Sequence, residues 1–184
     1  INDRDFNVLI TLIDLTFYSF NFKFLKKFLI KFLMKNPKIL TDNVHKIIFS
    51  SLDDCSCYFM KEFFKIPNVN VNYISNSRKR TFLSWAICRN NPNAVEFLLN
   101  IPNIDVNKWS FGLFSPLFIS CECFADIKIL KLLTEHPTFD FESFTKQSLI
   151  SIPLISVMKG NNYALELFLS KFKAIDDSMY CVSF

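Results

Sequence analysis

A seven-residue segment that occurs twice constrains the fold of this chain more than any other feature of its sequence. Residues 66–72 read IPNVNVN and residues 101–107 read IPNIDVN, so the second copy follows the first by 35 residues with only conservative changes. Hydrophobic pairs begin at intervals of 34 to 36 residues: Phe28-Leu29, Phe63-Phe64, Leu98-Leu99, Leu132-Leu133 and Phe168-Leu169. Self-similarity at this period is typical of architectures in which one supersecondary unit is copied along the chain.

Each copy contains two hydrophobic stretches separated by a polar break. The first stretch begins at Thr11, Lys46, Thr81, Ser115 and Ile152, and the second ends in the hydrophobic pair. In the third copy the apolar residues fall at helical spacing, so each stretch is expected to be a helix with one apolar face. Neither helix can bury that face alone, so neighbouring units must stack. The pattern predicts an all-α solenoid of about five helix-turn-helix units over residues 1–184, starting near residues 11, 46, 81, 115 and 152.

Local signals indicate where several of these helices begin and end. Pro116 and Pro153 fall in a first helical turn, where the missing N–H costs nothing, and Thr81 and Ser115 are suited to cap the same type of helix. The chain has only two Gly residues. Because Asn tolerates positive φ, we expect Asn90-Asn91 and Asn161-Asn162 to close helices where Gly usually would.

Several of these helix starts and loop segments resemble a known repeat family. The segments 81–86 (TFLSWA), 115–117 (SPL) and 104–107 (IDVN) resemble the ankyrin repeat, whose first helix opens with Thr-Pro-Leu-His and whose second ends in paired Leu before a Gly-Ala-Asp-Val-Asn-like segment. The resemblance extends from about Thr11 to Phe172 and is closest in units two to four. The motif His is replaced by Phe49, Ser84, Phe118 and Ile155. The resemblance therefore implies a divergent ankyrin-like array.

Composition narrows the class of protein further. Hydrophobic residues make up 51% of the chain and 23 are Phe, which favours a packed core over disorder. The net charge of +4 is mild and the basic residues are scattered among acids. The apolar segment from Phe6 to Phe22 is too short to span a membrane. The six cysteines, at 55, 57, 88, 121, 123 and 181, are expected to be structural and reduced, in a cytoplasmic protein that could associate with the cytoskeleton.

The sequence offers little catalytic or metal-binding chemistry. Cys55-x-Cys57 and Cys121-x-Cys123, with His45 and His136, could supply zinc ligands. Two residues spaced in this way on a helix point about 200° apart, so structural cysteines are favoured. The pair Asp53-Asp54 is expected to be solvated or to face a partner, because no nucleophile or His is placed beside it. Since nucleotide-binding and catalytic motifs are also missing from the sequence, we expect a protein that is not an enzyme and has no cofactor or metal.

The ankyrin-like resemblance implies a partner surface on the concave face, formed by loop tips and the exposed sides of the first helices. The residues placed there are His45, Asp53, Asp54, Arg78, Arg80, Arg89, Lys108, Trp109, Phe111, Phe114 and Glu122. Together they predict a surface with acidic residues in unit two, basic residues in unit three and aromatic residues in unit four. Trp109 is a candidate binding anchor because it is expected to lie in a loop, whereas Trp85 lies within a predicted helix and is expected in the core. The alternative is a rim that is merely solvated.

We therefore expect a protein–protein interaction scaffold whose partner binds the concave face. Reversing Arg78, Arg80 and Arg89 to Glu is predicted to weaken that binding without lowering thermal stability. A second hypothesis is a fixed structural component of a cytoskeletal or membrane-skeletal assembly, motivated by the many Phe residues. A third is weak nucleic-acid binding through the basic patch. Because Ile1 is not an initiator Met and residues 179–184 are apolar, the chain is also expected to be a fragment of a longer protein.

Overall fold

The computed structural model describes residues 22–36, 58–75, 79–110, 114–140 and 152–179. Within these residues there are eight helices and no strand, which agrees with the all-α prediction. The helices are α2 (Phe22–Lys35), α4 (Tyr58–Phe63), α5 (Phe82–Cys88), α6 (Pro92–Leu99), α7 (Pro116–Glu122), α8 (Ile127–Thr134), α10 (Ile152–Met158) and α11 (Asn162–Met179). None of these helices combines the length and the apolar character needed to cross a membrane.

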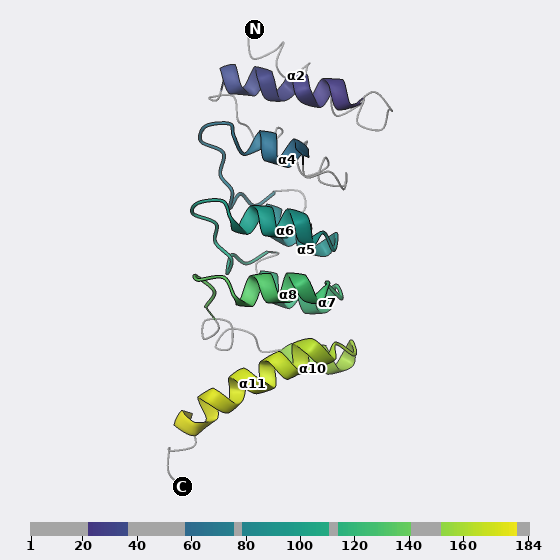
Figure 1. Ribbon diagram of the computed structural model, residues 1–184, viewed down its shortest axis with the longest axis vertical. Helices are drawn as coiled ribbons and strands as arrows, with labels where there is room; N and C mark the ends of the chain where they lie inside the picture. The colour runs from purple at the N-terminus through teal and green to yellow at the C-terminus, as the bar shows by residue number, and fades with distance from the viewer. Residues whose placement is uncertain (1–21, 37–57, 76–78, 111–113, 141–151, 180–184) are drawn as a thin grey trace.

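The helices pack in sequential pairs. Helix α5 packs on α6, α7 on α8, and α10 on α11, and α2 contacts α4. The pairs α5–α6, α7–α8 and α10–α11 also contact one another in chain order, because α7 lies against both α5 and α10 while α8 lies against α6. Figure 1 shows the pairs following one another along the long axis of the molecule. The first helices of successive pairs therefore form one face.

Short polar side chains begin most of these helices. The Thr81 hydroxyl accepts a hydrogen bond from the Ser84 N–H at 3.1 Å and the Ser84 hydroxyl accepts one from the Thr81 N–H at 2.9 Å, which is a capping box. The Ser115 hydroxyl caps α7 by accepting from the Phe118 N–H at 3.1 Å. Pro116 is the first residue of α7. The predicted capping roles of Thr81 and Ser115 are confirmed.

The turn within each pair contains a residue in the left-handed region. Asn90 has φ 51°, Phe124 has φ 52° and Gly160 has φ 66°. The prediction for Asn90 is confirmed, but the prediction that Asn161-Asn162 supplies this conformation is wrong. Gly160 takes the left-handed position because it has no Cβ to clash, and the Asn161 side chain instead accepts from the Ala164 N–H at 3.0 Å near the start of α11.

The second helices repeat at a constant interval of 35 residues, since Asn91, Asp126 and Asn161 each accept a hydrogen bond at the start of one. The caps of α5 and α7 are only 34 residues apart, so the α7–α8 turn is one residue longer than the α5–α6 turn. As a result, Leu133 rather than Leu132 is equivalent to Leu98, and both are fully buried. The alignment of Leu132-Leu133 with Leu98-Leu99 is therefore corrected by one residue.

The two copies of the repeated segment have equivalent surroundings. Asn68 and Asn103 both adopt left-handed backbone, with φ 66° and 64°. The Asn72 side-chain amide donates to the Asn103 carbonyl at 2.7 Å and accepts from the Asp105 N–H at 2.8 Å. The Asn107 amide makes the same two bonds, 35 residues later, to the Thr138 carbonyl at 2.8 Å and the Asp140 N–H at 3.1 Å. We call these bonds the Asn72 and Asn107 clamps; each ties one loop to the next.

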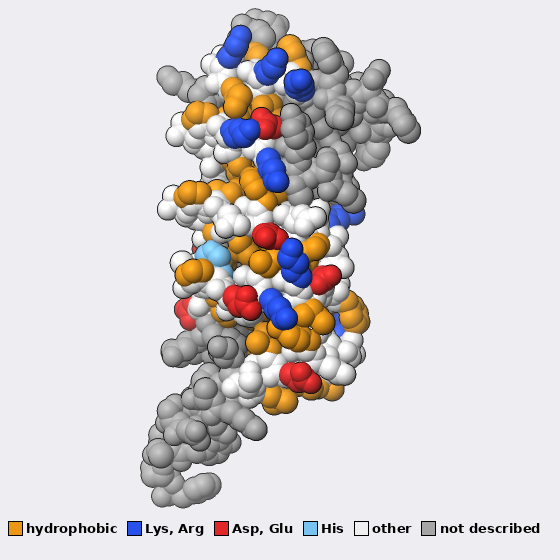
Figure 2. Space-filling view, in the orientation of Figure 1, with side chains coloured by type: hydrophobic (Ala, Val, Ile, Leu, Met, Phe, Trp, Pro, Cys, Tyr) orange, Lys and Arg blue, Asp and Glu red, His pale blue; other side chains and the backbone are white. Residues whose placement is uncertain are grey.

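Buried side chains form two clusters that cross the boundaries between pairs. The larger runs from Ile30 of α2 to Leu133 of α8 and includes Trp85, which confirms the prediction that this tryptophan belongs to the core. The smaller joins α7 and α8 to α10 and α11. On the face shown in Figure 2, basic side chains gather over the α2 end, and basic and acidic side chains are mixed over the pairs below it.

Candidate functional site

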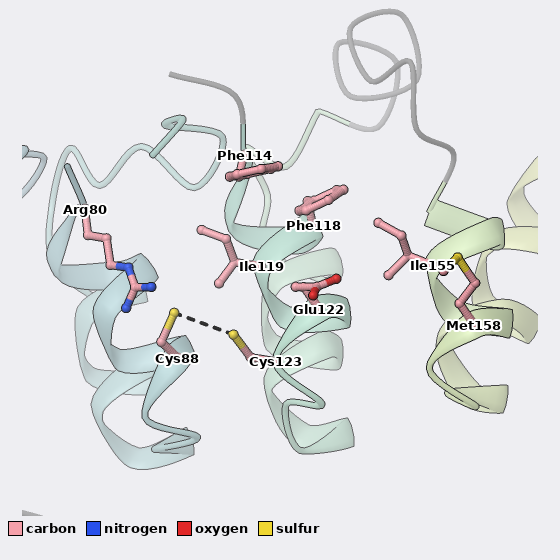
Figure 3. Close-up of a pocket in the computed structure, with 9 residues that line it drawn as sticks. All are labelled: Arg80, Cys88, Phe114, Phe118, Ile119, Glu122, Cys123, Ile155 and Met158. Atoms are coloured by element: carbon pink, nitrogen blue, oxygen red, sulfur yellow. Dashed lines mark hydrogen bonds between the residues drawn. The ribbon is translucent and has the colours of Figure 1, made fainter. Parts of the chain in front are cut away.

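An open groove with a volume of about 650 Å³ lies on the face formed by the first helices α5, α7 and α10 (Figure 3). We call it the α5–α7–α10 groove. Side chains from or next to all three helices line it: Arg80, Cys88, Phe114, Phe118, Ile119, Glu122, Cys123, Ile155 and Met158. Because α7 packs on α5 on one side and on α10 on the other, the groove extends across the contacts between three successive pairs.

The central part of the groove is apolar. The Phe114 and Phe118 rings stack with centroids 4.7 Å apart and planes inclined by 18°. Phe118, Ile119 and Ile155 are buried, whereas Met158 is 74% exposed. An apolar concavity with a few polar groups at its edges is typical of a binding site.

The α5 side of the groove is basic. Two guanidinium groups lie over the ring of Trp85, that of Arg89 at 4.7 Å and that of Arg80 at 5.4 Å from its centroid. A buried indole ring attracts a cation held over its face, so these contacts position both arginines. Arg80 is half-buried and lines the groove, while Arg89 is exposed beside it.

The α10 side of the groove carries a mixed cluster. Glu122 pairs with Lys159 at 3.2 Å, and the same ammonium group lies 5.5 Å from the centre of the Phe124 ring. Glu122 and Phe124 are exposed, so this ion pair contributes little to stability. The groove thus has a positive end and, across its apolar centre, an exposed carboxylate.

Two thiols meet between α5 and α7. The Sγ atoms of Cys88 and Cys123 are 3.7 Å apart, and the Cys123 thiol donates to the Cys88 sulfur. The pKa of Cys88 is raised from its usual 9.0 to about 12, mainly by burial and also by the neighbouring Cys123 thiol, against the lowering effect of the Arg80 and Arg89 charges. Cys121 is buried, and its burial raises the pKa of that thiol to about 11.

Three of the residues predicted from the sequence, Arg80, Phe114 and Glu122, line the groove together. Arg89 stacks beside it on Trp85. Lys108 and Trp109 are half-buried in the loop before α7, and Trp109 lines a separate small cavity that Leu117 and Phe139 share. The other predicted residues, His45, Asp53, Asp54, Arg78 and Phe111, lie outside the described residues.

Most of the residues that line the groove were not predicted from the sequence. Cys88, Phe118, Ile119, Cys123, Ile155 and Met158 line it but were not proposed as site residues. One signal was available, because Cys88 and Cys123 are 35 residues apart, close to the repeat interval, and both lie near the end of a predicted first helix. Considering Cys123 only with its near neighbour Cys121 concealed that match. Among the described residues, no three His, Cys, Asp or Glu side chains are grouped as metal ligands would be.

Comparison with known proteins identifies no relative: no protein-family model, curated protein or solved structure matches this chain. A functional proposal therefore depends on the residues of the chain itself.

Proposed function

We propose that this chain is a divergent ankyrin-like solenoid that acts as a non-enzymatic scaffold, holding a segment of a partner protein in the α5–α7–α10 groove. The groove is the observation that carries the proposal, because it combines an apolar centre with charged ends on a face built by three successive units. The 35-residue spacing of the caps and of the Asn72 and Asn107 clamps supports the repeat architecture.

The chemistry of the groove suggests what such a segment contains. An aromatic or aliphatic side chain would cover the Phe114 and Phe118 rings and remove apolar surface from water. A carboxylate at one side of that anchor would face Arg80 and Arg89, which are already positioned on Trp85. Opposite charge at this end would favour binding and set the direction of the segment.

Selection from a random peptide library, followed by affinity measurement on the best peptide, tests this proposal. We expect the selected peptides to share a hydrophobic anchor next to an acidic residue. Met158→Glu should then weaken binding about tenfold or more, because it places a charge at the apolar centre. Val157→Glu is the matched control, since Val157 is 60% exposed and does not line the groove. Equal affinities for the two variants would rule the groove out.

Reversing the arginine charges is a less informative test than the sequence suggested. Arg80 and Arg89 both contact the buried Trp85 ring, so changing them to Glu is expected to lower stability together with binding. Glu122→Lys is a cleaner change of charge, because Glu122 is exposed and its ion pair with Lys159 contributes little to stability. We expect Glu122→Lys to strengthen the binding of an acidic peptide at low salt, and weakened binding would contradict the assigned polarity.

A second candidate is a fixed structural part of a larger assembly. Large hydrophobic side chains are exposed near the turns of two successive pairs, namely Phe124, Ile127, Val157 and Met158. Apolar surface of this kind can mark a contact with another chain. Light scattering as a function of concentration distinguishes this candidate from the scaffold: association that Phe124→Ser and Val157→Ser abolish would favour it, and a monomer at all concentrations would favour the scaffold.

A further inference from the structure

Cys88 and Cys123 form the only cross-helix thiol pair among the described residues. Cys88 is the last residue of α5 and Cys123 caps the C-terminal end of α7. Their sulfur atoms are 3.7 Å apart, and both cysteines are free thiols. Figure 3 shows the two sulfurs pointing toward each other beside the groove.

The packing of the two helices fixes this pairing. Helices α5 and α7 lie against each other, so the thiols stay adjacent although 35 residues separate them in the chain. A disulfide bond is about 2.05 Å long, so the sulfurs must approach further before they can bond. Both residues lie at helix ends, where the backbone is less constrained than in the interior of a helix.

We propose that Cys88 and Cys123 are an oxidation-sensitive dithiol. On reaction with a peroxide, the two thiols form a disulfide between α5 and α7. The Cys123 sulfur attacks one peroxide oxygen, the O–O bond breaks, and a sulfenic acid and one water form. The Cys88 sulfur then attacks the Cys123 sulfur, the S–O bond breaks, and the hydroxyl leaves as a second water with the Cys88 proton. The two thiols lose two electrons and two protons, and hydrogen peroxide is reduced to two waters.

The surroundings assign the two roles. Cys123 is exposed and therefore meets the peroxide first. Cys88 is half-buried, and its pKa is raised to about 12, mainly by burial, so it is protonated at neutral pH and competes little with Cys123 for the peroxide. Cys121 is fully buried in the cluster that joins α7 to α10 and α11 and is not a partner in the bridge. The inference depends on the packing of α5 on α7 and not on the proposed function.

Disulfide mapping on the wild-type protein tests the inference directly. The reduced protein is treated with hydrogen peroxide, its remaining thiols are alkylated, and it is digested with trypsin without reduction. Cleavage after Arg80, Arg89, Lys108 and Lys128 places Cys88 in peptide 81–89 and Cys123 in peptide 109–128. We expect these peptides to appear joined, two hydrogens lighter than their sum, and to separate on reduction.

Three single variants locate the bridge. Cys88→Ser and Cys123→Ser should each abolish the joined peptide, and Cys121→Ser, which changes the other cysteine of peptide 109–128, should retain it. Protein oxidised in urea is the control for the folded geometry and should yield mixed pairings. The inference is overturned if Cys88 of the folded protein remains fully alkylated after peroxide treatment, or if the joined peptide persists in Cys123→Ser and disappears in Cys121→Ser.

Discussion

The pair α7–α8 and the pair α10–α11 meet the preceding pair in different ways. In the first case both helices take part, because α7 packs on α5 and α8 on α6 along their lengths. In the second case α10 packs on α7, while α11 meets α8 near its own beginning, where Lys131 lies over the Tyr163 ring at 5.6 Å, and then slants away (Figure 1). Helix α11 has 18 residues, whereas α6 and α8 have eight each.

Polar contacts also join the second helices and the loops of the α5–α6 and α7–α8 pairs. The α5–α6 and α7–α8 pairs are joined by a hydrogen bond from the Asp126 N–H to the Asn90 side chain at 2.7 Å and by the Lys128–Glu96 ion pair at 2.7 Å. The Asn107 clamp adds a contact between the loops. Contacts between the α5–α6 and α7–α8 pairs thus involve both helices and the loops, whereas the groove is lined along the first helices, which contact one another from α5 through α7 to α10.

The largest effect is expected from one substitution made at equivalent places in the two regions. Leu99 and Leu169 are separated by two 35-residue intervals, yet Leu99 is 8% exposed and Leu169 is 51% exposed. Leu99→Ala should lower the free energy of unfolding by about 2–4 kcal/mol because it leaves a cavity, and Leu169→Ala by less than about 1 kcal/mol. Urea denaturation measures both. Equal losses would show that α11 is covered as fully as α6.

The pH dependence of stability tests how well the Cys121 thiol is buried between α7 and the α10–α11 pair. Its pKa is raised from 9.0 to about 11 by burial, so the folded state retains the proton that the unfolded state loses. The stabilising contribution is therefore complete below pH 9 and is lost as the pH rises to about 11, by about 2–3 kcal/mol. The difference in unfolding free energy between wild type and Cys121→Ala should narrow over this range. A constant difference would mean that the thiol is accessible to water.

A smaller effect is expected from the Asn107 clamp. Asn107→Ala removes two hydrogen bonds to the next loop and should cost about 1–2 kcal/mol. Asn100→Ala is the matched control, because that side chain bonds only the Glu96 carbonyl of its own helix and is exposed. Thermal unfolding of both variants measures the difference. If the two cost the same, the clamp does not link the loops in solution.

The smallest effect is expected at the α7–α8 turn. Phe124 holds a left-handed backbone that Asn adopts more readily, as Asn90 does in the preceding turn. Phe124→Asn should raise the free energy of unfolding by up to about 1 kcal/mol. Loss of the contact between Lys159 and the Phe124 ring reduces this gain. The reciprocal Asn90→Phe should be destabilising, because it also removes the bond to Asp126. Calorimetry that finds Phe124→Asn destabilising would show that the ring contact outweighs the backbone strain.

The helical character and the sequential pairing were predictable, because apolar periodicity and the caps at Thr81 and Ser115 act locally. The extra residue in the α7–α8 turn was not, since hydrophobic pairs at Leu132-Leu133 fit either of two registers. The hydrogen bond that the Asp126 side chain accepts at the start of α8 decides between the two registers. Because the intervals between hydrophobic pairs already vary from 34 to 36 residues, they cannot locate a single extra residue in a turn.

The groove was predictable only in part. Charged and aromatic residues on the expected face, such as Arg80 and Glu122, were found from the resemblance to ankyrin repeats. The apolar centre was not, because Phe118 and Ile155 are apolar residues that the sequence pattern assigns to the core, and they are buried yet also line the groove. Where a buried side chain also faces an opening depends on how far successive helices are separated, and no local pattern specifies that distance.

Distances between spin labels at Lys61, Glu96, Lys131 and Glu166 test the central claim, that helix pairs lie side by side in chain order. These exposed residues are spaced by 35 and belong to four successive pairs. Labels attached through a genetically encoded ketone amino acid leave the six cysteines untouched. With about 10 Å between neighbouring helices, the distance from residue 61 should grow to roughly 20 Å at residue 131 and roughly 30 Å at residue 166. A distance from residue 61 to 166 no longer than that from 61 to 131 would contradict the claim.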